Sequence, residues 1–210
     1  MADNYLGKKL EDYMAGRQSS TTRKGVSLDR LLRKNRSYRG YDATYEVRAD
    51  QLRKIIEVNT KIPSAMNQQV LRFRPVLKAE ADKILPHIRL GGALPELKLP
   101  LAGSEPNAFV VVCSTKTGRY VDIDLGISAQ SMLLKAVEIG LGGICIAAFD
   151  KEAVTKALSL DIEPQLIIAI GRPAEKIELV EITADEPHAY YRSDGVHYVP
   201  KVGLDDLILK

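Results

Sequence analysis

The sequence predicts an α+β fold in which helices cover both faces of a central sheet, an α/β/α sandwich. Two continuous apolar runs, 108–113 and 165–170, carry this prediction, because strands buried on both faces lack the polar alternation of half-exposed strands. Between the two runs, apolar residues recur at helical spacing from Asp124 onward, as in a long buried helix. Helices that alternate with buried strands cover both sides of a sheet.

The composition is that of one compact domain. With 210 residues and 45% hydrophobic content the chain can bury one sizeable core, so we expect a single domain over residues 1–210. The formal net charge is only +3, and no basic patch interleaved with aromatic residues indicates nucleic-acid binding. Residues 1–25 are interpreted as an amphipathic lead helix and a polar linker. No long apolar run or signal-peptide core is present, so we expect no membrane span and a cytoplasmic location.

A helical run that begins at Ser27 ends in a cluster suited to phosphate. Residues 35–39 bring two guanidinium groups and a hydroxyl together, those of Arg36, Ser37 and Arg39. Arginine presents a rigid fork of donors that matches phosphate oxygens, and serine adds a short donor. Taken alone, the segment fits a basic helix end that faces water and neutralises the helix dipole better than it fits a binding site.

Residues 63–69 form the second candidate segment. They follow a helical pattern of apolar residues and open with a helix-initiation signal, Pro63 and Ser64. The amides of Asn67 and Gln69 carry both donors and acceptors, so they suit a heterocycle whose edge alternates carbonyl oxygens and ring N–H groups. The alternative is a capped helix start whose polar residues face water.

The third segment is the long helix and the strand after it. We expect Asp124 to be the N-terminal cap of the helix, and the glycines of 140–143 to end it with a tight return. The run 144–149 then forms a short strand with almost no side-chain chemistry. If this strand binds a ligand, its backbone does the binding.

Cysteine and histidine offer little material for other chemistry. Cys113 and Cys145 lie in apolar runs and are interpreted as small buried hydrophobes in a reducing compartment. The three histidines lack metal-ligand spacing, so we expect no metal site. The proline-rich segment 85–106 either borders a binding site or is a self-packed surface loop. The apolar tail 187–210 fits an arm that reaches a partner, or a strand that docks on its own subunit.

In their order and approximate spacing, these segments resemble the FMN-dependent nitroreductase family. The family's R-R-S-x-R element is similar to residues 35–39, its P-S-x-x-N-x-Q element to 63–69, and its D-x-G-x-x-A-Q helix with G-L-G to 124–130 and 140–142. Residues 165–173 resemble its penultimate strand and turn. Two departures are Asn35, which replaces the first arginine, and Val70-Leu71, which replaces a Pro-Trp pair. The resemblance implies a nitroreductase-like fold with a central mixed sheet, and a homodimer whose C-terminal arm crosses to the partner.

The resemblance also implies a flavin site built from matched residues. Arg36 and Ser37 would hold the FMN phosphate, Arg39 would reach the pyrimidine edge, and Asn67 would bond the ring or ribityl chain. Lys201 would compensate for the charge missing at Asn35. The full set of implied cofactor-binding residues is Arg36, Ser37, Arg39, Pro63, Ser64, Asn67, Gln69, Ile146, Ala147, Ala148 and Lys201.

The function implied is that of an FMN-dependent NAD(P)H oxidoreductase. NADH or NADPH delivers hydride to bound flavin, and a nitroaromatic, quinone or related small-molecule acceptor then takes the electrons, so no protein group is expected to be catalytic. A second hypothesis is a flavin-binding module without nicotinamide turnover, used for storage, sensing or assembly. A third, a nucleic-acid-binding helix near Arg30–Arg39, ranks far behind.

Overall fold

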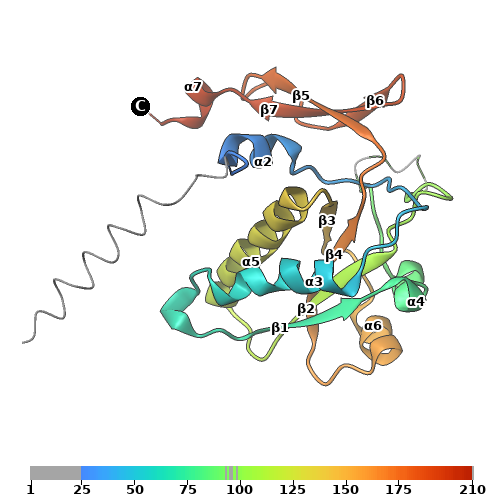
Figure 1. Ribbon diagram of the computed structural model, residues 1–210. Coiled ribbons are helices and arrows are strands. Elements are labelled where there is room, and N and C mark those ends of the chain that lie inside the picture. Colours follow the sequence, from blue (N-terminus) through green and yellow to red (C-terminus); the bar gives the residue numbers. More distant parts are fainter. Residues whose placement is uncertain (1–24, 93, 95–96, 98, 210) are drawn as a thin grey trace, which may run out of the picture.

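The computed structural model describes residues 25–92, 94, 97 and 99–209 (Figure 1). The predicted lead helix and nearly all of the linker after it lie outside these residues. The elements in chain order are α2 (Leu28–Lys34), α3 (Ala49–Ile56), η1 (Glu57–Thr60), η2 (Ala65–Asn67), β1 (Leu71–Val76), α4 (Lys78–Ala81), η3 (Leu85–His87), β2 (Ala108–Ser114), α5 (Arg119–Glu138), β3 (Gly142–Ile146), α6 (Lys151–Leu158), β4 (Pro164–Gly171), β5 (Lys176–Ile182), β6 (Tyr191–Ser193), β7 (Val196–Val202) and α7 (Leu204–Leu207).

The core is a four-stranded sheet in the order β1-β2-β4-β3. Every neighbouring pair is antiparallel, so this sheet differs from the mixed sheet that we expected. The physical reason is the place of β4. Strands β2 and β3 run in the same direction, but β4 lies between them and pairs with both, for example through Val110 opposite Ile168 and Ile144 opposite Ala169.

The two apolar runs form strands buried on both faces, as predicted. Successive residues of β2 alternate between two separate cores: Val110 and Val112 belong to one, and Phe109 and Val111 to the other. All four are fully buried. The period of two along a strand explains why a run without polar residues is required here.

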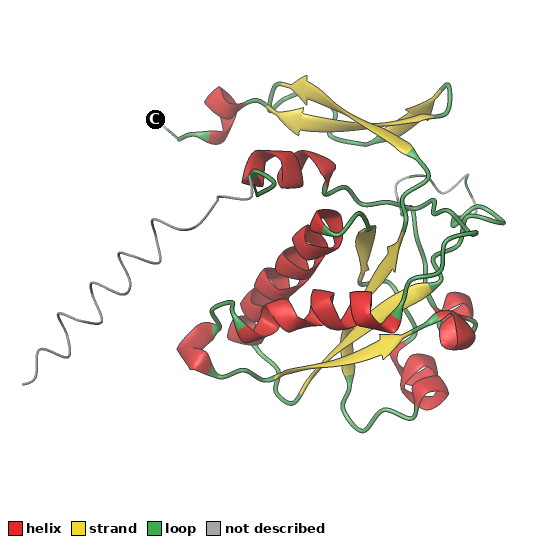
Figure 2. Cartoon of the chain, in the orientation of Figure 1, coloured by secondary structure: helices red, strands yellow, loops and turns green. Residues whose placement is uncertain are grey.

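Helices α3 and α5 cover one face of the sheet (Figure 2). Helix α5 begins at Arg119, not at Asp124, so the prediction that Asp124 caps this helix is wrong. Asp124 instead lies inside the helix and is 4% exposed. The helix ends where predicted, because Gly140 adopts a φ of 82° that favours glycine. In the described part of the chain, no helix is both long and apolar enough to cross a membrane.

Helices α4 and α6 cover the opposite face, so the α/β/α layering is confirmed. Ala81 and Ile84 contribute to this second core from α4 and the turn after it, and Val154 and Leu158 contribute from α6. The side chain of Asp150 caps α6 by accepting a hydrogen bond from the amide of Ala153 at 3.0 Å.

The tail and β5 together form a second sheet beyond α2, with the strand order β5-β7-β6 (Figure 1). Strand β7 pairs in parallel with β5 of its own chain, and the rings of Tyr191 and Tyr198 stack with centroids 5.1 Å apart. Of the two alternatives for the tail, docking on its own subunit therefore holds up to Val202. Beyond it, four apolar side chains are exposed, those of Leu204, Leu207, Ile208 and Leu209. We call residues 204–209 the arm tip.

Candidate functional site

Residues 35–39, here called the phosphate loop, leave the C-terminal end of α2. The guanidinium of Arg36 turns back and donates a hydrogen bond from Nη2 to the carbonyl of Leu32 at 2.6 Å. Its Nε is buried, and no described residue accepts a hydrogen bond from it. Burial lowers the pKa of Arg36, and the nearby Tyr38 opposes this shift. Ser37 is exposed and pairs with Gly143 at the start of β3.

Asn35 is tied to the long helix. Its Nδ2 donates to Oε1 of Gln130 on α5 at 3.2 Å. Both side chains belong to positions that we matched to family motifs, and the structure brings them together across 95 residues of sequence. An amide in this position adds no positive charge, so any phosphate here would depend on Arg36, on Ser37 and on cations from other segments.

Arg39 is held inside the protein. It is 7% exposed, its Nη1 donates to the carbonyl of Ser37 at 2.9 Å, and its guanidinium carbon lies 4.5 Å from the centre of the Tyr190 ring. Its Nη1 also lies 3.3 Å from Nε2 of His197. Arg39 therefore shapes the phosphate loop from within the protein, through the carbonyl of Ser37.

Three residues join Arg39 in a polar cluster that could not be assembled from the sequence, and of the four residues Arg39 and His197 are buried. Glu175 accepts hydrogen bonds from the backbone amides of Arg39 and Gly40, and it pairs with Arg192. His197 is 1% exposed, and burial, Arg39 and Arg192 lower its pKa while Glu175 opposes the shift. Neither Arg192 nor His197 was among the site residues predicted from the sequence. The signal missing from the sequence is the β5-β7-β6 pairing, which brings the tail back to the phosphate loop.

This region has an excess of unsatisfied donors. Among the described residues, three arginines have a buried Nε without a hydrogen-bond partner, and all three belong to the phosphate loop or the cluster next to it, namely Arg36, Arg39 and Arg192. Unsatisfied buried donors are costly, and an anion nearby lowers that cost. The donor set therefore fits a phosphate group better than a neutral or cationic ligand.

Residues 63–69, here called the amide loop, form a short 3-10 turn rather than the start of a regular helix. Three residues without the freedom of glycine adopt positive φ angles, Met66 at 52°, Asn67 at 51° and Gln69 at 45°. Such backbone costs on the order of 1–3 kcal/mol per residue and persists only where surrounding contacts hold it. Inside the loop, Gln69 donates from its backbone N to Ser64 Oγ at 3.3 Å and from Nε2 to Asn67 Oδ1 at 2.9 Å.

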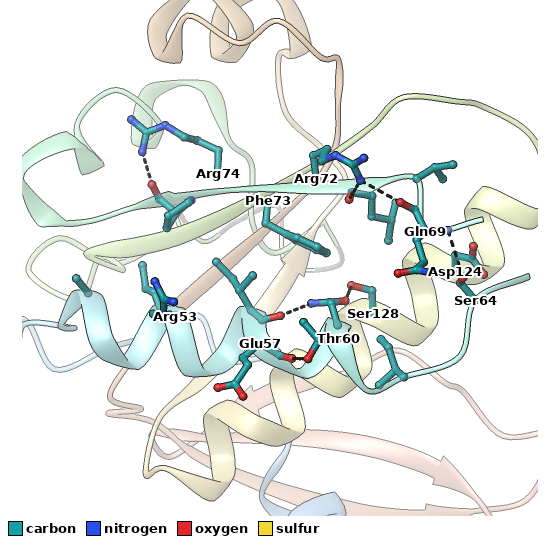
Figure 3. A pocket seen from close by; sticks show the side chains of 18 of the residues that line it. Arg53, Glu57, Thr60, Ser64, Gln69, Arg72, Phe73, Arg74, Asp124 and Ser128 are labelled. Carbon is teal, nitrogen blue, oxygen red and sulfur yellow. Dashed lines mark hydrogen bonds between the residues drawn. The ribbon is translucent and has the colours of Figure 1, made fainter. Parts of the chain in front are cut away.

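The amide loop opens on a cavity of about 960 Å³ between α3, η1 and β1. Figure 3 shows Ser64, Gln69 and Asp124 together at one end of this cavity, with Arg53 and Arg74 toward the other. The apolar part of the lining includes Leu52, Ile56, Ile62, Leu71, Phe73 and Leu77.

Strand β3, which was expected to bind through its backbone, covers Gly142–Ile146 and so begins and ends earlier than the predicted run 144–149. Ile146 is buried and pairs with Ile167, whereas Ala147 and Ala148 are exposed. The carbonyl of Ala148 accepts a hydrogen bond from the amide of Arg89 at 2.9 Å, so the start of segment 85–106 borders these residues. Cys145 is exposed, which corrects the prediction that both cysteines are buried; Cys113 is buried, and burial raises its pKa to about 11.

The predicted site residues do not gather in one place in one chain. Pro63, Ser64 and Gln69 line the large cavity, and Ala148 lines a smaller one of about 530 Å³. The phosphate loop lines neither of these cavities. Lys201 is exposed on β7, opposite Glu181 of β5. Among the described residues, no group of three or more histidine, cysteine or acidic side chains could hold a metal ion.

Comparisons with known proteins agree with the fold described above. The model of the nitroreductase family matches residues 102–172, a segment that runs from the loop before β2 to the turn after β4. A nitroreductase family protein from Streptococcus pneumoniae has a similar structure, with a TM-score of 0.61 and 18% identity over 77% of this chain and 96% of that chain.

Two further proteins of similar structure are associated with FMN. A protein from Exiguobacterium sibiricum, assigned as a nitroreductase and solved in complex with FMN, matches with a TM-score of 0.59 and 16% identity over 74% of this chain and 92% of that chain. A protein from Staphylococcus epidermidis, assigned as an NAD(P)H:FMN oxidoreductase, matches with a TM-score of 0.57 and 19% identity over 71% of this chain and 88% of that chain. The predicted resemblance is therefore confirmed, and the fold is that of the nitroreductases.

Proposed function

We propose that this chain, which has the fold of the nitroreductases, is an FMN-dependent oxidoreductase that takes hydride from NADH or NADPH and reduces a small-molecule acceptor such as a nitroaromatic or a quinone. The observation that carries the proposal is the phosphate loop. It presents Arg36, with a buried and unpartnered Nε, beside the exposed hydroxyl of Ser37 on this fold. The proposal includes a single domain over residues 1–210 and a cytoplasmic location.

Each segment has its own part in the proposed site. Arg36 and Ser37 bind the phosphate, and Arg39 holds the carbonyl of Ser37 and so keeps the loop in shape. Lys201 is the tail cation that we propose to approach the phosphate, because it is exposed on β7, the strand that also carries His197 beside Arg39. Asn67 and Gln69 supply amides for the ring, and Pro63 and Ser64 set the direction of their loop.

The backbone of residues 146–148 faces the ring in this proposal. Small side chains at Ala147 and Ala148 leave the main chain accessible. When bound, FMN supplies the hydride and electron chemistry, which needs no nucleophile or metal from the protein. Backbone N–H groups fixed near the pyrimidine edge would favour the negative charge that develops there on reduction.

A homodimer accounts for the separation of the candidate segments. In one chain the amide loop and the phosphate loop lie on different parts of α5, since the amide loop is bonded to Asp124 and the phosphate loop to Gln130. We propose that a second copy brings its amide loop to the phosphate loop of the first. Each of the two flavin sites is then completed across the interface.

The arm tip is the segment that we propose to cross between subunits. Its apolar side chains are exposed, and Asp205 and Asp206 give it negative charge. The cavity of the partner offers an apolar lining, and its β1 is an edge strand that, among the described residues, pairs with β2 alone. Arg53 and Arg72 at this cavity form no ion pair with a described residue, so their charge complements the tip. Covering a free strand edge is a common role of such segments.

The test of the function is a visible absorbance spectrum. The purified protein is incubated with excess FMN, desalted, and then treated anaerobically with NADH and, separately, with NADPH. Retained flavin that bleaches with either donor, followed by reoxidation with a quinone or nitroaromatic, is the expected result. Loss of all flavin on desalting, or bound flavin that neither nicotinamide reduces, would contradict the proposal.

One observation favours the second candidate, a flavin-binding module without nicotinamide turnover. Asn35 replaces a phosphate-binding arginine of the family pattern, and its side chain is already occupied by Gln130. A site that has lost this charge can keep flavin and lose turnover. Flavin that stays bound and yellow in the presence of both nicotinamides would select this candidate.

A further inference from the structure

The amide loop contains unfavourable backbone φ angles, and none of them belongs to a glycine. Three positive φ angles fall within four residues, at Met66, Asn67 and Gln69, and the side chain of Met66 is 81% exposed. The apolar side chain of Met66 therefore does not hold the loop by packing in the core. Besides the hydrogen bonds within the loop, a contact from another element is needed to keep the loop in this conformation.

That contact comes from the long helix on the same chain. The carboxylate of Asp124 accepts one hydrogen bond from the backbone amide of Ala65 at 2.7 Å and another from Nε2 of Gln68 at 2.9 Å. The two oxygens each take one donor, so the carboxylate clamps the loop just before Met66 and just after Asn67. Asp124 is 4% exposed, and the two contacts span 59 and 56 residues of sequence.

The residue type at position 124 follows from this geometry. An ionised carboxylate accepts at both oxygens, and hydrogen bonds to a charged group are shorter and stronger than neutral ones. A helix interior rarely keeps an acidic residue buried unless its oxygens are satisfied. Here the cost of burying Asp124 is offset by two donors that both belong to the amide loop, so the carboxylate serves to hold that loop.

We propose that Asp124 is a positioning residue for flavin binding: it holds the amide loop in its strained conformation so that Asn67 and Gln69 present their amides to the isoalloxazine ring. The inference rests on the proposed function, because it concerns the same cofactor. Asp124 was not among the predicted cofactor-binding residues, and it acts on the ligand only through the loop.

The experiment compares three variants of the full chain for FMN affinity, for the visible circular dichroism of bound flavin and for hydrogen exchange of individual amides. Asp124→Ala removes both contacts. Gln68→Ala removes one of them from the side of the loop and leaves α5 untouched, so it covers the case in which Asp124→Ala does not fold. Ser128→Ala is the matched control, because Ser128 is also buried on α5 but donates its hydrogen bond to Asn59, outside the loop, at 2.5 Å.

We expect Asp124→Ala to weaken FMN binding about tenfold or more and Gln68→Ala to weaken it less, since one charge-assisted contact of the two remains. The dichroism of the bound flavin should change in both variants. In Asp124→Ala the amide of Ala65 should exchange hydrogen faster, while the amides of β2 keep their protection. Ser128→Ala should change thermal stability but neither flavin affinity nor dichroism.

Two outcomes would overturn the inference, and they can be told apart. If the native chain binds FMN and Asp124→Ala and Gln68→Ala bind it with unchanged affinity and dichroism, the positioning role fails while the proposed function stands. If the native chain binds no FMN, the proposed function fails and the role toward flavin fails with it. In that case the exchange of Ala65 still reports whether Asp124 holds the loop.

Discussion

The carboxylate of Glu175 accepts a hydrogen bond from the backbone amide of Gly40 at 3.1 Å, and through it the turn after β4 is fastened to the end of the phosphate loop. The same carboxylate accepts from the amide of Arg39 and pairs with Arg192 of β6. One side chain thus connects the central sheet, the phosphate loop and the C-terminal sheet.

Replacing Glu175 should destabilise the protein. Glu175→Gln keeps the size of the side chain but removes the charge that satisfies two backbone amides and Arg192, a loss of about 1.5–3 kcal/mol in the free energy of unfolding. Urea unfolding followed by circular dichroism measures it. Glu163→Gln is the control, because Glu163 forms an exposed pair with Lys151, and its midpoint should stay at the native value. Equal midpoints for the two variants would refute the connecting role of Glu175.

Arg36→Ala should weaken FMN binding. It removes a charge-assisted contact to phosphate worth roughly 1.5–3 kcal/mol, which is about ten- to a hundredfold in the dissociation constant. Fluorescence quenching of FMN during titration gives this constant. Arg33→Ala is the matched control on the same helix, since Arg33 is exposed and paired with Asp29 at 2.9 Å. If both variants bind flavin as tightly as the native chain, the phosphate site lies elsewhere.

Gly143→Ala should be strongly destabilising. A Cβ at this position would lie 2.2 Å from the carbonyl oxygen of Ala169 on the adjacent strand, so the sheet would have to separate, at a cost of about 1–3 kcal/mol or more. At Gly126, on α5, a Cβ would meet nothing within 4 Å. Gly126→Ala should therefore raise stability by about 0.5–1 kcal/mol. Thermal unfolding of the two variants checks the opposite signs, and a stable Gly143→Ala variant would contradict the strand spacing.

The protein should lose stability as the pH falls below about 6.5, the value for an unfolded histidine. Burial and the charges of Arg39 and Arg192 lower the pKa of His197 in the folded state, with Glu175 opposing. Between the folded and unfolded pKa values the unfolded chain therefore binds more protons, so the free energy of unfolding rises with pH and falls on acidification.

Unfolding midpoints at a series of pH values from 7.5 to about 5 measure this slope. His197→Gln should flatten it, because glutamine does not titrate. His188→Gln, at an exposed position of the tail, controls for the loss of a histidine elsewhere. If the slope persists in His197→Gln and disappears in His188→Gln, the pH dependence comes from His188 and the prediction is wrong.

Leu207→Asp should convert the proposed dimer to a monomer. Leu207 is 65% exposed in the single chain, and a carboxylate there would have to enter the apolar cavity of the partner. Sedimentation velocity of the native protein and the variant measures the change. Leu101→Asp, at a loop residue that is 44% exposed, is the control and should leave the assembly as it is. A dimer that survives Leu207→Asp would remove the arm tip from the interface.

Much of the fold could be predicted because its signals are local. The runs that became β2 and β4 had to be buried on both faces, since they contain no polar alternation, and the glycine at position 140 had to end a helix. The start of α5 was misplaced because Arg119 to Ile123 lack a regular apolar pattern, and an aspartate near a helix start resembles a cap. Strand neighbours cannot be read from periodicity, so the place of β4 between β2 and β3 was missed.

By itself, the sequence determined which segments are apolar, which are strands or helices, and which carry donors suited to a phosphate and a ring. Only the tertiary structure decided that Arg39 is buried beside Tyr190 and His197, that Cys145 is exposed, and that Asp124 holds the amide loop across 59 residues of sequence. The physical reason is that burial and hydrogen bonding between distant residues depend on how strands pair and helices pack. Those arrangements follow from the whole chain, whereas propensity and periodicity are local properties.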